Sequence, residues 1–232
     1  IARIVDDSEY LDFKGLYGVH TVCGHGAIEG HTVGFIGNNG PIDADGATKA
    51  AQFIQLCCQS NIPIVYLQNT TGYMVGREAE QAGIIKHGSK MIQAVANSTV
   101  PQITLHIGAP FGAGNYGMCR RGHDPRLLFA RPRNPTAVMG PEQAAKVMSI
   151  VTEGKLKREG KPVDHDKLAA MEKGIADRMQ GETTALYATA RLWDDGLIDP
   201  RDTRKVLAFC LSICREADIR PLRHTTFGVA RM

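Results

Sequence analysis

Hydrophobic and polar positions change their period along the chain, and these changes mark the expected elements. Residues 17–28 and 31–38 are rich in β-branched and small side chains and are joined by Glu29-Gly30, a pair that favours a tight turn. They predict a β-hairpin. In segment 47–60 apolar residues follow helical spacing, so that one face of a helix is apolar. The residues of that face are Ala47, Ala50, Ala51, Ile54 and Cys58.

The order strand, glycine-bearing loop and helix then recurs about every 30 to 40 residues. Strands are expected at 63–69, 102–108, 127–130 and 136–139, and helices at 78–97, from about 113, and at 141–151. The loops 70–76 and 109–112 each connect a strand to the helix that follows it. This alternation predicts an α/β fold, with strands buried between or beside helices. Residues 1–7 have the pattern of a helix end.

The last third of the chain has a different pattern. Segment 153–182 carries charges of both signs in near balance and a thin apolar stripe, which predicts exposed helices that rest on another surface or are simply solvated. Closing helices are expected at 185–193 and 201–217, with Asp199-Pro200 between them. The inward residues of the last helix would be Val206, Cys210, Ile213, Cys214 and Ala217. Residues from 1 to about 150 are thus expected to form a core, and residues from about 151 to 232 a helical arm with closing helices.

Composition and charge exclude several classes of protein. The 232 residues include 27 Lys and Arg against 24 Asp and Glu, a formal net charge of +3, and only 6% are aromatic. This balance lacks the basic stripe, interleaved with aromatics, of a nucleic-acid-binding protein. No run of about 18 uncharged apolar residues is present, so no membrane-spanning helix is expected. The chain begins at Ile1 in mid-pattern, which we interpret as part of a longer protein.

Cysteine and histidine spacing gives no sign of a metal site. The six cysteines form no CxxC pair, and the eight histidines form no H-E-x-x-H motif. We therefore expect no metal, and reduced cysteines that act as small core residues in a reducing compartment. The cysteines are Cys23, Cys57, Cys58, Cys119, Cys210 and Cys214.

The candidate chemistry lies in the glycine-bearing loops. In stretch 108–118, Gly112, Gly114 and Gly117 match a dinucleotide-binding pattern, but the acid that this interpretation requires about 20 residues later is missing. Small residues at the start of a helix still bring free N–H groups close to a ligand, where they stabilise an enolate or an oxyanion. One well-placed donor of this kind contributes about 3 kcal/mol in the transition state.

Loop 69–76 is of the same kind, so the two loops could face a shared pocket. Equally, both could be tight turns that need glycine for steric reasons. A side-chain catalyst is not evident. No serine lies in a G-x-S-x-G elbow, and Asn115 stands at the position where a serine peptidase of related architecture would have its nucleophile. Glu78 and Glu80 suit the start of a helix, where acids complement the helix dipole. The sequence therefore indicates a site of backbone donors, with a base supplied from elsewhere.

Six motifs carry a resemblance to a known family. With these motifs in order, the whole chain resembles the carboxyltransferase β-subunits of biotin-dependent acyl-CoA carboxylases, in the methylcrotonoyl-CoA and geranyl-CoA carboxylase branch. The motifs are Ile36-Gly-Asn-Asn-Gly40, Phe53-Ile-Gln-Leu-Cys-Cys-Gln59, Leu67-Gln-Asn-Thr-Thr-Gly-Tyr-Met-Val-Gly-Arg-Glu78, Gly112-Ala-Gly-Asn-Tyr-Gly-Met-Cys119, Val138-Met-Gly-Pro-Glu-Gln-Ala-Ala145 and Leu192-Trp-Asp-Asp-Gly-Leu-Ile-Asp-Pro200.

The resemblance implies a crotonase-like ββα superhelix with a C-terminal helical extension. It identifies the chain as the C-terminal half of an enzyme subunit, a CoA carboxyltransferase domain that transfers CO₂ from carboxybiotin to 3-methylcrotonoyl-CoA or geranyl-CoA. The implied partners are the acyl-CoA, a biotin carboxylase or biotin carboxyl carrier subunit, and further copies in a homo-oligomer. The implied location is a bacterial cytoplasm, which we prefer, or a mitochondrial matrix. A freed biotin ureido nitrogen would be the base that the side chains do not supply.

The same resemblance assigns roles to residues. The backbone N–H groups of Gly112, Ala113 and Gly114 would hold the biotin ureido oxygen, with Asn115 beside them. Gly72 and Tyr73 would line the same pocket or supply the paired donor. Acyl-CoA contacts would lie around Asn38-Asn39-Gly40. The form Gly72-Tyr73, where methylcrotonoyl-type subunits usually have Gly-Phe, is more similar to geranyl-CoA carboxylases.

Two other functions remain open. A crotonase-type hydratase or isomerase needs an acid beside the second glycine loop, and the nearest candidate is Asp124. A non-catalytic assembly domain is the second alternative, in which arm 153–182 docks a partner subunit of a carboxylase complex.

Overall fold

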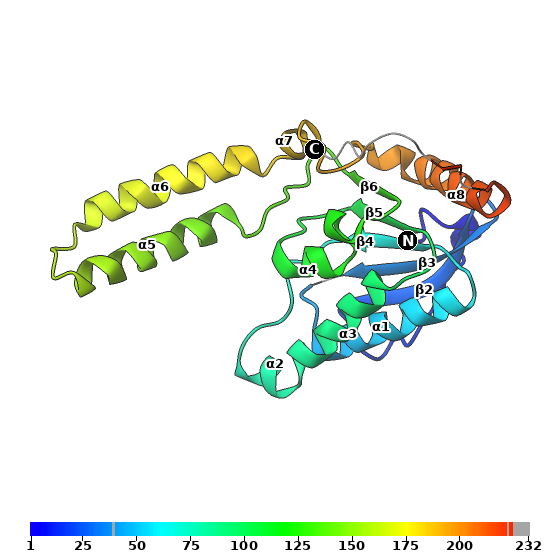
Figure 1. The fold of residues 1–232 in the computed structure, drawn as a ribbon, viewed down its shortest axis with the longest axis horizontal. Helices are drawn as coiled ribbons and strands as arrows, with labels where there is room; N and C mark the ends of the chain where they lie inside the picture. Colours follow the sequence, from blue (N-terminus) through cyan, green and yellow to red (C-terminus); the bar gives the residue numbers. More distant parts are fainter. Residues whose placement is uncertain (39, 222, 225–232) are drawn as a thin grey trace.

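The computed structural model describes residues 1–38, 40–221 and 223–224, and these form one mixed sheet with helices on both faces (Figure 1). The sheet order follows the sequence. β1 to β3 pair antiparallel, and β3 to β6 pair parallel. The strands are β1 (Leu11–Asp12), β2 (Thr21–Ile28), β3 (His31–Asn38), β4 (Ile64–Gln68), β5 (Gln102–His106) and β6 (Leu127–Ala130). The α/β prediction is confirmed.

The predicted hairpin is β2–β3, with the expected turn. Glu29 and Gly30 have φ angles of 49° and 78°, as a two-residue turn with left-handed geometry requires. Their N–H groups both donate to the Asp6 carboxylate at 2.8 Å, and Arg204 also donates to that carboxylate. The expected helix end at 1–7 is therefore wrong. Asp6 lies in the short 3₁₀ helix η1 (Asp6–Ser8), where its carboxylate binds the hairpin turn.

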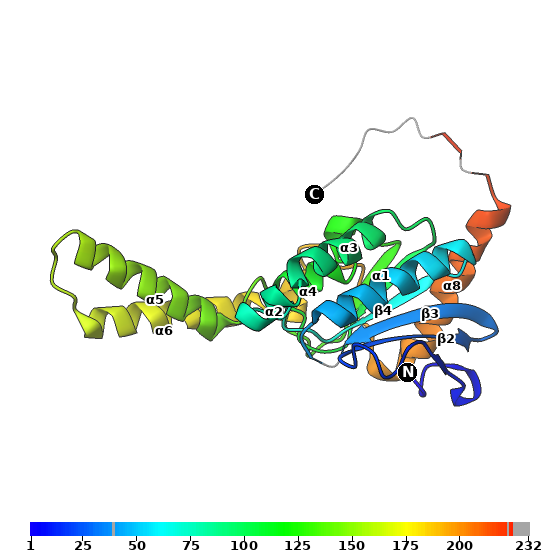
Figure 2. The same cartoon turned by 90° about the horizontal axis from the view of Figure 1, so that it is seen from below.

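The helices cover the sheet in two layers (Figure 2). α1 (Ala44–Gln59) and α3 (Ile84–Ala96) pack on one face, over strand residues such as Ile36 and Tyr66. α8 (Thr203–Ile219) packs on the other face, over Phe35 and Leu67. Successive strand residues thus point to opposite layers, and the strands are buried on both sides.

Two helix boundaries differ from the prediction, each for a local reason, and one predicted strand is missing. α1 begins three residues early, at Ala44, because the Asp43 carboxylate caps its first turn by accepting from Gly46 N–H at 2.6 Å. The predicted helix 78–97 is divided into α2 (Arg77–Gln81) and α3, because Gly83 has a φ of 83°. Segment 136–139 forms no strand; a single bridge joins Ala137 to Phe111.

The arm is a pair of helices that projects from the core (Figures 1 and 2). α5 (Pro141–Arg158) and α6 (His165–Glu182) run side by side, and few of their residues are buried. The chain returns through α7 (Ala185–Thr189) and the 3₁₀ helix η3 (Pro200–Asp202). In α8, Leu207 and Leu211 face inward with Cys210 and Cys214. Ile213, expected inside, is 45% exposed, because helix α8 is rotated relative to the predicted face.

No helix in the described ranges is both long and apolar enough to cross a membrane.

Candidate active site

The two glycine-bearing loops meet at one edge of the sheet. β4 and β5 are parallel neighbours, so the loops that follow them leave the same edge. Phe111 N–H donates to Thr70 O at 3.0 Å across the two loops. A Cβ on Gly114 would lie 2.7 Å from the Cα of Gly72. The loops are therefore in backbone contact.

The second loop leads into the short helix α4 (Gly112–Gly117), whose first N–H groups differ in availability. Gly112 N–H donates to Ala137 O at 3.2 Å, so it is occupied within the protein. In the described part of the chain, no hydrogen bond engages the N–H of Ala113 or Gly114. The predicted set of three donors narrows to these two, at the positive end of α4.

At Gly72-Tyr73 the first loop forms a parallel β-bridge with Ile42. Ile42 N–H donates to Gly72 O at 2.9 Å, and Met74 N–H donates to Ile42 O at 2.8 Å. In such a bridge the N–H of the middle residue, Tyr73, points away from Ile42. Gly72 N–H donates to the Thr70 hydroxyl at 3.2 Å, so Tyr73 N–H is the better candidate donor of this loop.

The Tyr73 side chain does not face the loop edge. Its ring packs into the core beside Gly88 and Gly117, where a Cβ would lie 3.2 Å and 2.1 Å from ring or hydroxyl atoms. Its hydroxyl donates to Met91 Sδ at 3.7 Å, and burial raises the pKa of Tyr73 to about 12. Tyr73 can thus act in the site through its backbone, while its ring anchors the loop between α3 and α4.

Asn115 is also buried beneath the loop. Its side chain is fully inaccessible and donates to Pro110 O at 3.3 Å and to the Thr136 hydroxyl at 3.4 Å. The expected direct contact of this side chain with a cofactor does not fit that burial. Asn115 instead holds the loop before α4 against the segment after β6.

The expected acyl-CoA region reaches the same edge. Asn38 ends β3, which is parallel to β4, so it lies on the side of the two loops. The Asn38 amide is buried, and its oxygen and nitrogen have no partner among the described residues. Gly40 has a φ of 135° and approaches His20. Asn39 lies outside the described residues.

Two candidate bases, His106 and Asp124, are not available to the glycine loops. His106 ends β5, but burial and the nearby Arg120 lower its pKa to about 3, so it is neutral and inaccessible. Asp124 precedes β6, and two residues later Arg126 N–H donates to Gln102 O at the start of β5. Asp124 thus lies at the opposite edge, where it cannot serve the glycine loops.

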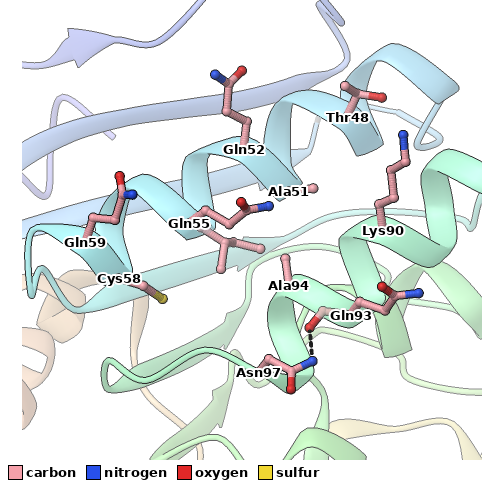
Figure 3. Close-up of a pocket in the computed structure, with 11 residues that line it drawn as sticks. Thr48, Ala51, Gln52, Gln55, Cys58, Gln59, Lys90, Gln93, Ala94 and Asn97 are labelled. Carbon is pink, nitrogen blue, oxygen red and sulfur yellow. Dashed lines mark hydrogen bonds between the residues drawn. The ribbon is translucent and has the colours of Figure 1, made fainter.

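One groove of about 620 Å³ borders α4, with Tyr116, Ala137 and Val138 among the residues that line it. A groove of about 680 Å³ runs between α1 and α3 and is lined mainly by polar side chains (Figure 3), none from the two loops. Within the described ranges, no three His, Cys, Asp or Glu side chains gather as metal ligands. The loop edge itself is open, with Ala113 exposed. A second protein surface would be needed to enclose a substrate there.

Sequence reasoning missed the polar side chains beneath the loops. Thr70 is buried and bonds the backbone of its own loop, and Gln68 is fully buried at the end of β4. The only indication in the sequence was that both residues lie at the end of a predicted strand or directly after it. Single polar residues there are common enough that no contact could be deduced.

A sheet with parallel central strands, a ββ hairpin and paired glycine loops at one edge is the arrangement of the crotonase-like fold. Within that fold class, the chain belongs to the carboxyl transferase domain family, whose family model matches residues 1–226. Both the family and the fold predictions are thereby confirmed.

Individual relatives agree with the family assignment. The chain is 49% identical to the methylcrotonoyl-CoA carboxylase beta chain, mitochondrial, of Arabidopsis thaliana, covering 100% of this chain and 39% of that protein. It is 45% identical to the biotin-dependent 3-methylcrotonyl-coenzyme A carboxylase beta1 subunit of Mycobacterium tuberculosis, covering 100% and 43%. The chain thus spans about 40% of the length of these relatives.

Solved structures give the same result. The geranyl-CoA carboxylase beta subunit of P. aeruginosa superimposes with a TM-score of 0.89 at 58% identity, covering 99% of this chain and 43% of that one. The transcarboxylase 12S subunit, described as a hexamer assembly, superimposes with a TM-score of 0.83 at 32% identity, with the same coverage.

Proposed function

We propose that the chain is the C-terminal carboxyltransferase domain of an acyl-CoA carboxylase subunit, with its core at residues from 1 to about 150 and its arm and closing helices at about 151 to 232. The observation that carries this is the backbone contact between Gly72 and Gly114. It brings the loops that carry Tyr73 N–H and the N–H groups of Ala113 and Gly114 to one edge, where neither His106 nor Asp124 can act as a base. Such a site can stabilise developing negative charge but needs its base from a co-substrate.

The donors fit the carbonyl oxygen of a biotin ureido group. Ala113 and Gly114 N–H are free of partners in the described chain, and the absence of a Cβ at Gly114 lets the backbone of Gly72 approach them. Carboxybiotin would supply the carboxyl group and, once it has lost that group, a basic ureido nitrogen. Tyr73 N–H would then be the paired donor for the acyl thioester oxygen or a further donor in the same pocket.

The acyl substrate we propose is a branched unsaturated acyl-CoA, 3-methylcrotonoyl-CoA or geranyl-CoA. The identity of 58% with a geranyl-CoA carboxylase subunit, against 45–49% with methylcrotonoyl-type subunits, favours geranyl-CoA. The acyl-CoA contacts of this half would lie near Asn38 and Gly40. Because the loop edge is open, the upstream half of a neighbouring copy would complete the site, in an oligomer that works with a biotin carboxylase or biotin carboxyl carrier subunit.

In this proposal the protein is part of a ligase, and its reaction belongs to the catabolism of leucine or of acyclic terpenes. We place it in a bacterial cytoplasm, with a mitochondrial matrix as the alternative.

The test is ATP-dependent fixation of labelled bicarbonate by the full-length subunit with its biotinylated partner. The panel is 3-methylcrotonoyl-, geranyl-, propionyl- and acetyl-CoA. Label on geranyl-CoA or 3-methylcrotonoyl-CoA is the expected result, and omission of the biotinylated partner should abolish it. An intact complex that labels none of the four would refute the proposal.

A further inference from the structure

α4 packs against Tyr73 through Gly117 and against Gly72 through Gly114, but it has few apolar side chains of its own. Three of its six residues are glycines, which lose more backbone entropy in a helix than other residues and add no apolar side chain. Hydrophobic packing therefore cannot fix its position as it fixes α1 or α3. Yet its first turn must be placed accurately, because Ala113 and Gly114 are the candidate donors. A polar contact at the end of α4 adds to those of its first turn.

Gln68 provides that contact from the neighbouring strand. Its side chain is fully buried, and Nε2 donates to Met118 O at 2.5 Å and to Asn115 O at 3.4 Å. Met118 O lies just after α4, where carbonyls have no partner within the helix, and Asn115 O, in the last turn, also accepts from Met118 N–H at 3.3 Å. A donor at this end also suits the negative pole of the helix.

The backbone carbonyl of Gln68 binds the start of the segment that leads from β5 into α4. Gln68 O accepts from Ile107 N–H at 3.0 Å and from Gly108 N–H at 3.1 Å, at the start of the segment that leads into α4. Gln68 also comes directly before loop 69–76. One residue thus joins the first loop, the start of the second loop and the end of α4.

We propose that Gln68 is a positioning residue for carboxyl transfer: its amide fixes α4 so that Ala113 and Gly114 N–H point to the reacting oxygen. This rests on the proposed function for the chemistry, but not for the contact itself. The amide orientation follows from the two carbonyls, because an oxygen facing them would be repelled.

Two Gln68 variants and two matched controls test the proposal in the full-length subunit with its partner. Gln68→Met keeps the shape and removes both donors. Gln68→Glu places a carboxyl group against the two carbonyls; ionised it repels them, and protonated it can donate one hydrogen bond. The control is Gln102→Met, because Gln102 is a buried glutamine on β5 that bonds Tyr66 and Val95 and does not touch α4. Gln102→Glu is the control for pH.

The first measurement is hydrogen exchange of peptides covering residues 110–119, which needs no activity. We expect faster exchange there in Gln68→Met, by about 10-fold or more, and no change in Gln102→Met at equal global stability. Equal exchange in the two variants would overturn the proposal.

The second measurement is the kinetics of carboxylation. Gln68→Met should lower kcat about 10- to 100-fold with the acyl-CoA KM within about threefold, since the donors act on the transition state. Gln68→Glu should regain activity relative to the wild type as the pH falls, and Gln102→Glu should not. Faster exchange with an unchanged kcat would refute the positioning role. An inactive wild type would refute the proposed function instead, while exchange would still decide whether Gln68 holds α4.

Discussion

Gly114 approaches Gly72 so closely that a Cβ on Gly114 would lie 2.7 Å from the Cα and 2.9 Å from the carbonyl carbon of Gly72. Both neighbours are backbone atoms, which cannot rotate away as a side chain can. The contact is therefore the point at which the two loops set each other's position. Any side chain at residue 114 must push the loops apart.

Gly114→Ala should accordingly separate the donors. We expect kcat/KM for carboxylation to fall at least about 100-fold, equivalent to one lost donor of about 3 kcal/mol, and overpacking to lower the free energy of unfolding by about 1–3 kcal/mol. The matched control is Gly174→Ala in α6, where a Cβ meets nothing within 4 Å. That change should leave activity intact and raise stability by up to about 1 kcal/mol. Equal activity in both variants would contradict the contact's role.

Removal of a single N–H is a more direct test of the donors. Ala113 lies in the first turn of α4, where proline is tolerated because the N–H has no partner within the helix. Ala113→Pro should lower kcat about 10²- to 10³-fold while the protein remains folded by circular dichroism. Ala113→Ser keeps the N–H and should retain most of the activity. A folded and fully active proline variant would remove the Ala113 N–H from the site.

The sequence predicted the elements that depend on local rules. The β2–β3 turn was placed at Glu29-Gly30, since a two-residue turn with left-handed geometry has few solutions. The break at Gly83 was missed, because glycine inside a helical pattern is compatible with either a continuous helix or a left-handed break. The inward face of α8 was predicted wrongly because apolar residues stand next to each other in the sequence, for instance Val206 and Leu207. Either of two helix faces could therefore have pointed inward.

For the site, the positions of the two loops could be predicted from the sequence, but the roles and contacts of the individual loop residues only in part. Gly72, Ala113 and Gly114 were predicted as donors because small residues after a strand bring backbone N–H groups close to a ligand, but Gly72 N–H donates to the Thr70 hydroxyl instead. The burial of Asn115, the occupation of Gly112 N–H by Ala137 and the anchor at Gln68 depend on contacts between segments far apart in the sequence. No periodicity encodes such contacts, so the structure was needed to find them.

His106 predicts how stability depends on pH. Burial, aided by Arg120, lowers its pKa from 6.5 to about 3 in the folded chain. Below pH 6.5 the unfolded chain binds a proton that the folded chain excludes. The stabilising contribution is thus complete above pH 6.5 and is lost as the pH falls towards 3, by up to about 1.4 kcal/mol per pH unit.

His106→Gln removes this titration. Between about pH 7.5 and about pH 5, the wild-type free energy of unfolding should fall by about 2 kcal/mol more than that of His106→Gln, measured by urea denaturation. His165→Gln, at an exposed position at the start of α6, should keep the wild-type dependence. Parallel pH curves for the wild type and His106→Gln would show that His106 does not cause the loss.

The last prediction concerns the order in which the six free cysteines react. Burial raises the pKa of the Cys57 thiol to about 12, and likewise those of Cys23 and Cys119. Cys58 is the exception. Burial acts on it in the same direction, but hydrogen bonds with Ser98, at 3.4 Å, and with Thr99 outweigh it and lower its pKa. Cys58 is also partly exposed in the groove between α1 and α3 (Figure 3).

Because the thiolate is the reactive form, iodoacetamide should modify Cys58 of the native protein well before Cys57, its neighbour in sequence. Peptide mass spectrometry over a time course at neutral pH measures the two rates within one molecule, so Cys57 is the internal control. Ser98→Ala should slow the modification of Cys58 several-fold, because it removes a hydrogen bond that stabilises the thiolate, and should leave the rate at Cys57 unchanged. Similar rates at the two cysteines, or no effect of Ser98→Ala, would contradict this assignment.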